Sequence, residues 1–128
     1  MKISVAMATY NGAQYIEEQL ESIRIQTMPV DEVRICDDGS SDDTVEVICH
    51  YIREHGLESS WSVEVNQENL GYASNFMKAV GLTNGDYVFF CDQDDIWIAD
   101  RAERMIGLME AHPDMLLLGS EFDSFVSA

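Results

Sequence analysis

The sequence predicts an α/β fold, in which helices cover both faces of a mostly parallel β-sheet. Short apolar segments alternate about four times with amphipathic segments, and the connections between them are short. The chain has 128 residues, enough for one ordinary domain and too few for two. Hydrophobic residues make up 46% of the chain and only two prolines occur, which excludes disordered and collagen-like classes.

The first half of the chain predicts two strand-helix units. Lys2–Ala8 is a short apolar run of the kind that forms a strand buried on both faces. Ala13–Gln26 has apolar residues at helical spacing and glutamates on its other side, which indicates an amphipathic helix. Glu32–Cys36 predicts the second strand. Asp43 and Glu46 then have the spacing of a capping box at the start of the second helix.

The second half repeats the pattern. Trp61–Asn66 alternates apolar and polar residues like a third strand, and a helix follows Gly71. Tyr87–Cys91 is a strongly apolar fourth strand, and Asp100 caps a fourth helix with regular apolar spacing. Met115–Leu118 predicts the start of a fifth strand.

The excess of acidic residues limits the kinds of molecule that this protein is expected to bind. Seven Lys and Arg against 24 Asp and Glu give a formal net charge of -17, so sequence-independent binding to nucleic acid is not expected. No apolar run approaches the ~20 residues of a membrane span, and the N-terminus lacks a signal-peptide pattern. We expect a cytoplasmic protein without a membrane span. For the full-length protein, peripheral association with the inner face of the membrane is an alternative.

Cysteines and histidines do not form a predicted metal site. Cys36, Cys49 and Cys91 are odd in number, lie beside apolar residues and show no C-x-x-C spacing, which favours reduced thiols over disulfides or zinc. The three histidines show no H-x-x-x-H pairing.

Polar segments follow the predicted strands where each strand ends. They are Thr9–Gly12, Asp37–Ser40, Asn69–Asn75 and Asp92–Asp95. Ligands of open parallel sheets bind at the carboxyl ends of the strands, so we expect the functional site at this edge.

Carboxylates dominate that edge. Five of them are expected there: Asp37, Asp38, Asp92, Asp94 and Asp95. A like-charge pair ~4 Å apart costs roughly 4 kcal/mol at an effective dielectric near 20, so a compensating cation is needed. Oxygen ligands favour Mg²⁺ or Mn²⁺ with a phosphorylated ligand. The alternative, turn and cap residues on solvated loops, is the favoured interpretation for Asp42 and Asp43.

These motifs together resemble the family-2 glycosyltransferases of GT-A fold. The matching segments are Ala8-Thr9-Tyr10-Asn11-Gly12, Asp37-Asp38-Gly39-Ser40-Ser41-Asp42, Asn69-Leu70-Gly71 with Asn75, and Asp92-Gln93-Asp94-Asp95-Ile96-Trp97. Their order and spacing cover nearly the whole chain from Ile3 to Met109. The resemblance implies a Rossmann-like nucleotide-binding half, a nucleotide-diphosphate-sugar donor, a divalent metal and inverting transfer to an acceptor hydroxyl.

The resemblance also implies roles for individual residues in nucleoside binding. Thr9, Tyr10 and Asn11 match the loop that lies against the nucleoside. Either Asp37 or Asp38 matches the carboxylate that accepts from the base N–H, a charged hydrogen bond worth ~1.5–3 kcal/mol.

Further roles concern the phosphates and the metal. Asp94 matches the direct metal ligand of the family's D-x-D signature, and Asp92 lies nearer the ribose and the metal's water shell. Asp95 is an extra acid. Gly71 and Asn75 match a helix start near the nucleotide, where N–H groups can approach an anion. Their alternative interpretation is a turn glycine and a helix-surface asparagine.

By the same resemblance, the chain corresponds to the N-terminal, donor-binding part of one glycosyltransferase domain. The general base and acceptor segment are expected beyond residue 128, so this piece is expected to bind donor without transferring sugar. The Asp92–Trp97 form is similar to bacterial rhamnosyltransferase-like enzymes of surface-polysaccharide synthesis. That similarity implies a UDP or dTDP donor and, for the full-length protein, a saccharide or lipid-linked acceptor. An uncovered Met115–Leu118 strand predicts self-association.

Two other magnesium-binding α/β modules are alternatives. A receiver domain needs an acidic pair after its first strand and a lysine after its fifth, whereas no lysine follows Lys78 here. A nucleotidyltransferase needs a Gly-rich basic loop after its first strand, and the segment Asn11–Gln14 has no basic residue.

Overall fold

The structure is a computed structural model that describes residues 2–91 and 95–111. Within these residues, strands and helices alternate in the predicted order. The elements are β1 (Ile3–Thr9), α1 (Ile16–Arg24), β2 (Glu32–Asp37), α2 (Thr44–Glu54), β3 (Trp61–Val65), α3 (Tyr72–Gly81), β4 (Tyr87–Cys91) and α4 (Arg101–Ala111). The predicted fifth strand at Met115–Leu118 lies outside the described residues.

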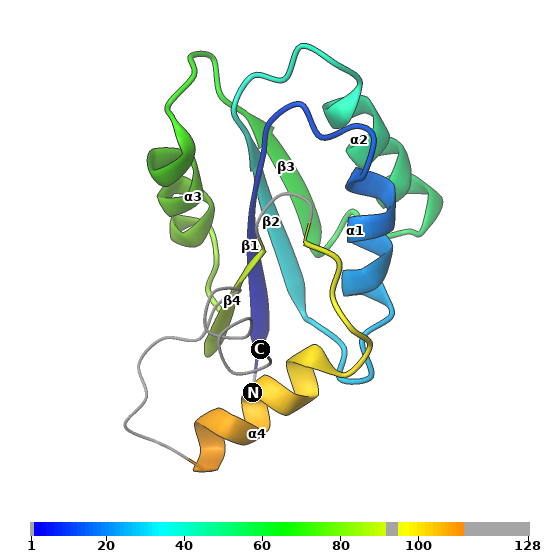
Figure 1. The fold of residues 1–128 in the computed structure, drawn as a ribbon, viewed down its shortest axis with the longest axis vertical. Coiled ribbons are helices and arrows are strands. Elements are labelled where there is room, and N and C mark those ends of the chain that lie inside the picture. Colours follow the sequence, from blue (N-terminus) through cyan, green and yellow to red (C-terminus); the bar gives the residue numbers. More distant parts are fainter. Residues whose placement is uncertain (1, 92–94, 112–128) are drawn as a thin grey trace.

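The four strands form one parallel sheet in the order β3-β2-β1-β4. Helices α1 and α2 lie against one face and α3 against the other, while α4 crosses near the amino-terminal end of the strands (Figure 1). The predicted α/β class, a parallel sheet with helices on both faces, is confirmed. α1 is shorter than predicted, because residues 13–15 form a turn before the helix begins.

The central strand β1 is buried along its whole length and serves both faces. Val5 and Met7 point into the larger core with residues of α1, α2 and α4. Ala6 and Ala8 point to the opposite face, where they pack in a smaller cluster with Phe76 of α3. Because side chains alternate along a strand, the small residues at every second position allow α3 to lie close to the sheet.

The predicted capping box at α2 does not form. Asp43 occupies the N-cap position but its side chain makes no capping hydrogen bond. Instead, Oδ1 of Asp42 accepts from the backbone N–H of Thr44 at 3.0 Å. The Thr44 hydroxyl accepts from the N–H of Gly12 at 2.8 Å, so the start of α2 is tied to the β1–α1 loop.

The cysteines are free thiols, as predicted. Cys36 and Cys91 are buried, and Cys49 is half-buried. Burial raises the pKa of the Cys36 thiol, which keeps it neutral. Within residues 2–91 and 95–111, no group of three or more His, Cys, Asp or Glu side chains is arranged to hold a metal ion.

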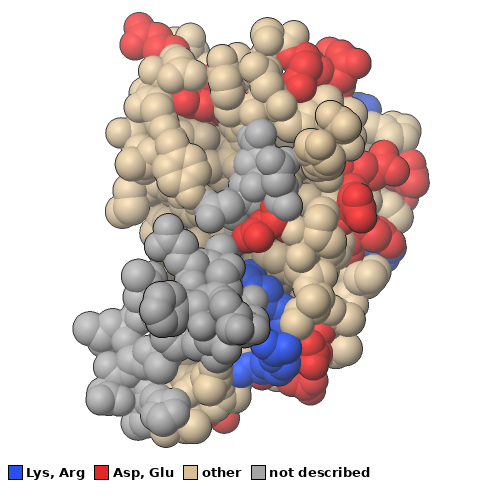
Figure 2. Space-filling model, viewed as in Figure 1, with Lys and Arg blue, Asp and Glu red and all other residues tan. Residues whose placement is uncertain are grey.

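The surface reflects the excess of acidic residues. Red carboxylate side chains are spread over the face seen in Figure 2, whereas most of the basic atoms in view gather in one place low on it. None of the helices that the structure describes has the length and apolar character needed to cross a membrane.

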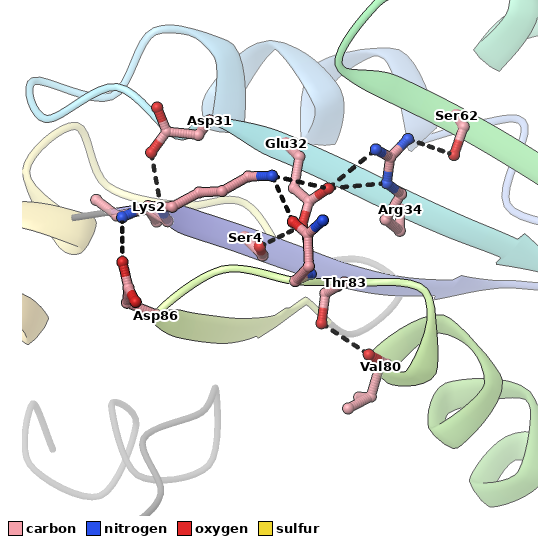
Figure 3. Close-up of polar contacts among 11 residues, drawn as sticks. Lys2, Ser4, Asp31, Glu32, Arg34, Ser62, Val80, Thr83 and Asp86 are labelled. Carbon is pink, nitrogen blue, oxygen red and sulfur yellow. Dashed lines mark hydrogen bonds and ion pairs between the residues drawn. The ribbon is translucent and has the colours of Figure 1, made fainter.

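A buried carboxylate organises the amino-terminal end of the sheet, opposite to the predicted site (Figure 3). Glu32 of β2 accepts from the Ser4 hydroxyl at 2.5 Å and from the N–H of Asn84 at 2.7 Å. Its other oxygen accepts from Nε of Arg34 at 3.0 Å, and Nζ of Lys2 lies 3.9 Å away. Burial opposes ionisation of Glu32, but these hydrogen bonds and the Arg34 charge hold its pKa below the usual value of 4.5.

We expect Glu32→Gln to lower the free energy of unfolding at pH 7 by roughly 2 kcal/mol, because its amide would face N–H and O–H donors. A lowered pKa means that the ionised group stabilises the fold above its unfolded pKa and ceases to do so as pH falls through the folded value. The difference between wild type and variant should therefore shrink as the pH falls below the usual pKa of 4.5.

Urea unfolding at several pH values measures this difference. The exposed Glu58, changed to Gln, is the matched control and should leave stability unchanged. A gap between wild type and Glu32→Gln that is constant with pH would show that the ionised carboxylate does not stabilise this end of the sheet.

Candidate functional site

A pocket of about 400 Å³ opens at the carboxyl end of β1 and β2, beside the start of α3. Its lining residues are Ala8, Thr9, Tyr10, Asp38, Asn69, Gly71, Tyr72 and Asn75. Five of the residues predicted to bind substrate are therefore together at the predicted edge. Asn11 and Asp37 are not among the lining residues. Asp92 and Asp94 lie outside the described residues.

Asp37 is fully buried and holds the loop that follows β2. Its Oδ1 accepts from the hydroxyls of Thr9 at 2.7 Å and Ser40 at 2.6 Å. Its Oδ2 accepts from the backbone N–H of Gly39 at 3.1 Å and of Ser40 at 2.7 Å. A carboxylate has about four acceptor sites, so Thr9 of β1 and the loop together use all of them.

Asp38 lines the pocket and keeps an acceptor site. Its Oδ1 accepts from the amide of Asn66 at 2.9 Å and from the N–H of Leu70 at 2.7 Å. Its Oδ2 accepts from the N–H of Gly71 at 3.0 Å. These are three donors for about four acceptor sites, which leaves one site on Oδ2 among the described contacts.

The charge of Asp38 is maintained by the same contacts. Burial of the carboxyl raises its pKa, but the hydrogen bonds from Leu70, Asn66 and Gly71 outweigh this effect and hold the pKa below the usual value. Asp38 is therefore an ionised acceptor at neutral pH.

The segment between β3 and α3 is shaped by Asp38. Gly71 has φ +86°, a conformation that glycine adopts without strain, and its N–H donates to Oδ2 of Asp38. Asn69 donates its side-chain amide to the carbonyl of Asp38 at 3.2 Å. The turn-glycine interpretation of Gly71 and its place in the pocket thus both hold.

Asn75 is not a helix-surface residue. It is 2% exposed, and its Nδ2 donates to the carbonyl of Cys36 at 2.8 Å. Its Oδ1 accepts from the amide of Asn66 at 2.7 Å. Asn66 and Lys78, which contact this group from outside the pocket, carry no motif in the sequence, so sequence reasoning missed them. The one feature of the sequence that could have pointed to them is that Lys78 is one of only two lysines in an acidic chain.

The loop after β1 is tied to the loop after β2. Asn11 adopts φ +51°, which asparagine tolerates, and its Oδ1 accepts from the N–H of Ser41 at 2.8 Å. Its own N–H donates to the Ser40 hydroxyl at 2.8 Å. The structure thus gives Asn11 a structural contact, while its neighbour Tyr10 is 47% exposed at the pocket.

The remaining predicted acids follow β4. This strand pairs with β1 and ends at Cys91, directly before Asp92 in the chain. Asp95 is half-buried. The pairing of Met7 with Cys91 brings the ends of β4 and β1 side by side, and Ala8 and Thr9 of β1 line the pocket.

Comparison with known sequences points to one family. The model of glycosyl transferase family 2 matches residues 4–125. The dTDP-rhamnosyl transferase RfbG of Shigella flexneri is 40% identical over 104 residues, which are 78% of this chain and 35% of that protein. The glucosyltransferase WfgD of Escherichia coli, which uses UDP-Glc, is 31% identical over 107 residues, 84% of this chain and 40% of that protein. The chain thus spans less than half the length of these relatives.

Solved structures share the fold. S. aureus TarS 1-349 in complex with UDP-GlcNAc superimposes with a TM-score of 0.76 and 29% identity, over 88% of this chain and 32% of that one. The mannosyltransferase PcManGT of Pyrobaculum calidifontis in complex with GDP-Man and Mn²⁺ has a TM-score of 0.70 and 30% identity, over 77% of this chain and 29% of that one. The expected GT-A architecture is confirmed, and the chain belongs to glycosyl transferase family 2.

Proposed function

We propose that this chain binds the sugar donor of a metal-dependent, inverting glycosyltransferase. The full reaction would move a sugar from a nucleotide diphosphate to a saccharide or lipid-linked acceptor in bacterial cell-surface polysaccharide synthesis, in the cytoplasm. Membership of glycosyl transferase family 2 and the pocket at the carboxyl edge of the sheet support the proposal. The receiver and nucleotidyltransferase alternatives have no such support.

The observation that carries the proposal is the single open acceptor site of Asp38 in the pocket. Uracil and thymine each present one imide N–H, which can donate to this oxygen. Cytosine presents a ring nitrogen acceptor at the same place, which an ionised carboxylate repels. Of the two aspartates left open by the sequence, we therefore assign base recognition to Asp38.

Aromatic side chains complete the pocket. Tyr10 and Tyr72 are 47% and 64% exposed and both line it. The ring of Tyr72 packs edge-on against Phe76, with centroids 5.5 Å apart. Stacking of a base on an aromatic ring contributes ~1–3 kcal/mol, so these rings would bind the base while Asp38 reads its edge.

The nucleotide is proposed to be UDP or dTDP. The names of RfbG and WfgD specify dTDP and UDP donors, and TarS was solved with UDP-GlcNAc. Guanine also has an N–H donor, and PcManGT was solved with GDP-Man, so GDP is a necessary competitor in any test.

We propose that Asp94 and Asp92 hold Mn²⁺ or Mg²⁺. Their carboxylate oxygens are the donors that hard divalent cations prefer, and PcManGT was solved with Mn²⁺. The net charge of -17 and the acidic surface in Figure 2 disfavour a bare diphosphate. When bound, such a cation supplies positive charge that offsets the charge of the diphosphate.

The proposed transfer is a single displacement. The acceptor oxygen forms a bond to the anomeric carbon as the bond from that carbon to the diphosphate oxygen breaks, and the configuration inverts. The acceptor proton passes to a general base, a role that we assign to none of the described residues. The described residues bind and orient the nucleotide.

Calorimetry with free nucleotides tests the proposal. We expect UDP or dTDP to bind more than about tenfold tighter than CDP, because only the imide bases donate to Asp38. Mn²⁺ should tighten UDP binding by roughly 5- to 150-fold relative to excess chelator, and UDP should tighten Mn²⁺ binding equally. Equal affinities for UDP, CDP and GDP would contradict base recognition by Asp38, and equal affinity with and without Mn²⁺ would contradict the metal assignment.

A further inference from the structure

The buried side chain of Asn66 lies behind the pocket, and the proposed function gives it no role. Asn66 follows β3, is 6% exposed and is not among the pocket's lining residues. Its N–H donates to the carbonyl of Asp37 at 2.8 Å, which continues the ladder between β2 and β3. This contact fixes the backbone of Asn66 beside Asp38.

The side chain of Asn66 uses all of its amide groups. One Nδ2 hydrogen is directed to Oδ1 of Asp38 at 2.9 Å, and the other to Oδ1 of Asn75 at 2.7 Å. Its own Oδ1 accepts from Nζ of Lys78 at 2.7 Å. Lys78 comes from α3, and its Nζ also lies 4.0 Å from the carboxylate of Glu64.

Only one orientation of the Asn66 amide satisfies these contacts. The Lys78 ammonium can only donate, so the amide oxygen must face it, and the NH₂ group must face Asp38. The Asn75 amide is fixed in the same way, because the Cys36 carbonyl can only accept and lies 2.8 Å from its Nδ2. A reversed Asn66 would place two acceptors against each other at Asp38 and leave the Lys78 donor facing NH₂.

We propose that Asn66, oriented by Lys78, is a positioning residue that sets the direction of the open acceptor site of Asp38 and thereby the base selectivity of the pocket. The inference rests on the proposed function of Asp38. With the N–H groups of Leu70 and Gly71 on one side, the Asn66 amide closes the remaining site of Oδ1, so only Oδ2 can accept from a ligand. Without it, Oδ1 has one donor fewer, and a second acceptor site opens in a different direction from the site on Oδ2.

Asn66→Ala tests the inference through the ratio of UDP to CDP affinity. We expect UDP to bind about tenfold more weakly and the ratio to fall by a similar factor, because the carboxylate no longer presents a single acceptor site in one direction. A variant that only loosened the fold would weaken both nucleotides alike. The melting temperature, measured alongside, shows that binding is compared between folded proteins.

Lys78 gives a second variant, because its partly exposed side chain can be changed while the buried Asn66 itself is kept. We expect Lys78→Met to lower the UDP-to-CDP ratio by about threefold, since the Asn66 amide loses the donor that orients it, and Lys78→Arg to restore the ratio. Lost attraction between Lys78 and the diphosphate would affect UDP and CDP equally and would leave the ratio unchanged.

Lys2→Met is the matched control. Lys2 is the other lysine of the chain, is similarly exposed, and also donates to an asparagine oxygen beside a glutamate, but at the opposite end of the sheet. It should leave the ratio unchanged.

The outcomes separate the two claims. A wild type that does not prefer UDP over CDP would overturn the proposed role of Asp38 and this inference with it. A selective wild type whose selectivity survives both Asn66→Ala and Lys78→Met would overturn the positioning role alone. Loss of selectivity in both variants, with rescue by Lys78→Arg, would establish it.

Discussion

Asp38→Asn is expected to weaken UDP binding by about 1.5 to 3 kcal/mol, or roughly 10- to 150-fold. The substitution removes the charge that strengthens the hydrogen bond to the base. It also places an NH₂ group either toward the N–H of Gly71 or toward Asn66 and Leu70, where Asp38 now accepts. Calorimetry with UDP in the presence of Mn²⁺ measures the loss.

Asp37→Asn is the matched control, since the two aspartates are neighbours of the same charge. Its carboxylate accepts from four donors, one on Thr9 of β1 and three in the loop after β2, so the amide is expected to lower the free energy of unfolding by roughly 1–3 kcal/mol. UDP binding to the folded variant should change by less than about threefold. A larger loss of UDP affinity from Asp37→Asn than from Asp38→Asn would reverse the assignment of the base-binding residue.

The second large effect is expected from Asp94→Ala. The variant should bind UDP equally with Mn²⁺ and with chelator. The factor by which Mn²⁺ tightens UDP binding, roughly 5- to 150-fold in the wild type, should therefore fall to about one. The reason is that a divalent cation needs the carboxylate charge to be held next to the diphosphate. Titrations of UDP at fixed Mn²⁺, and of Mn²⁺ at fixed UDP, should lose the same factor.

Asp42→Ala is the control for this experiment, because it removes another aspartate near the carboxyl edge. Oδ2 of Asp42 accepts from the N–H of Ala13 at 3.2 Å, and Oδ1 accepts from that of Thr44 at 3.0 Å. These contacts join the β1–α1 loop to the start of α2. The Mn²⁺ linkage should persist in Asp42→Ala. If it also persists in Asp94→Ala, the cation is held by other groups, and the D-x-D assignment is wrong.

The sequence by itself determined the order of elements and the edge that carries the pocket. Burial on both faces makes β1 a continuous apolar run, and one-sided burial gives α1 its helical spacing of apolar residues. Alternation of strands and short helices then predicts a mostly parallel sheet, in which the strand ends lie at one edge, and the structure has this arrangement. The sequence was sufficient to place five pocket residues at this edge: Thr9, Tyr10, Asp38, Gly71 and Asn75.

Only the tertiary structure decided what each polar side chain contacts. Asp37 and Asp38 are chemically identical neighbours, but Asp37 is the last residue of β2 and accepts from the loop, whereas Asp38 follows the strand and lies in the pocket beside α3. Asn66, directly after β3, and Lys78, in α3, reach this site through contacts that no local pattern encodes. Periodicity records which face of an element is buried, whereas hydrogen-bond partners depend on where distant segments lie. Asp38 and its partner Asn66 are 28 residues apart in the chain.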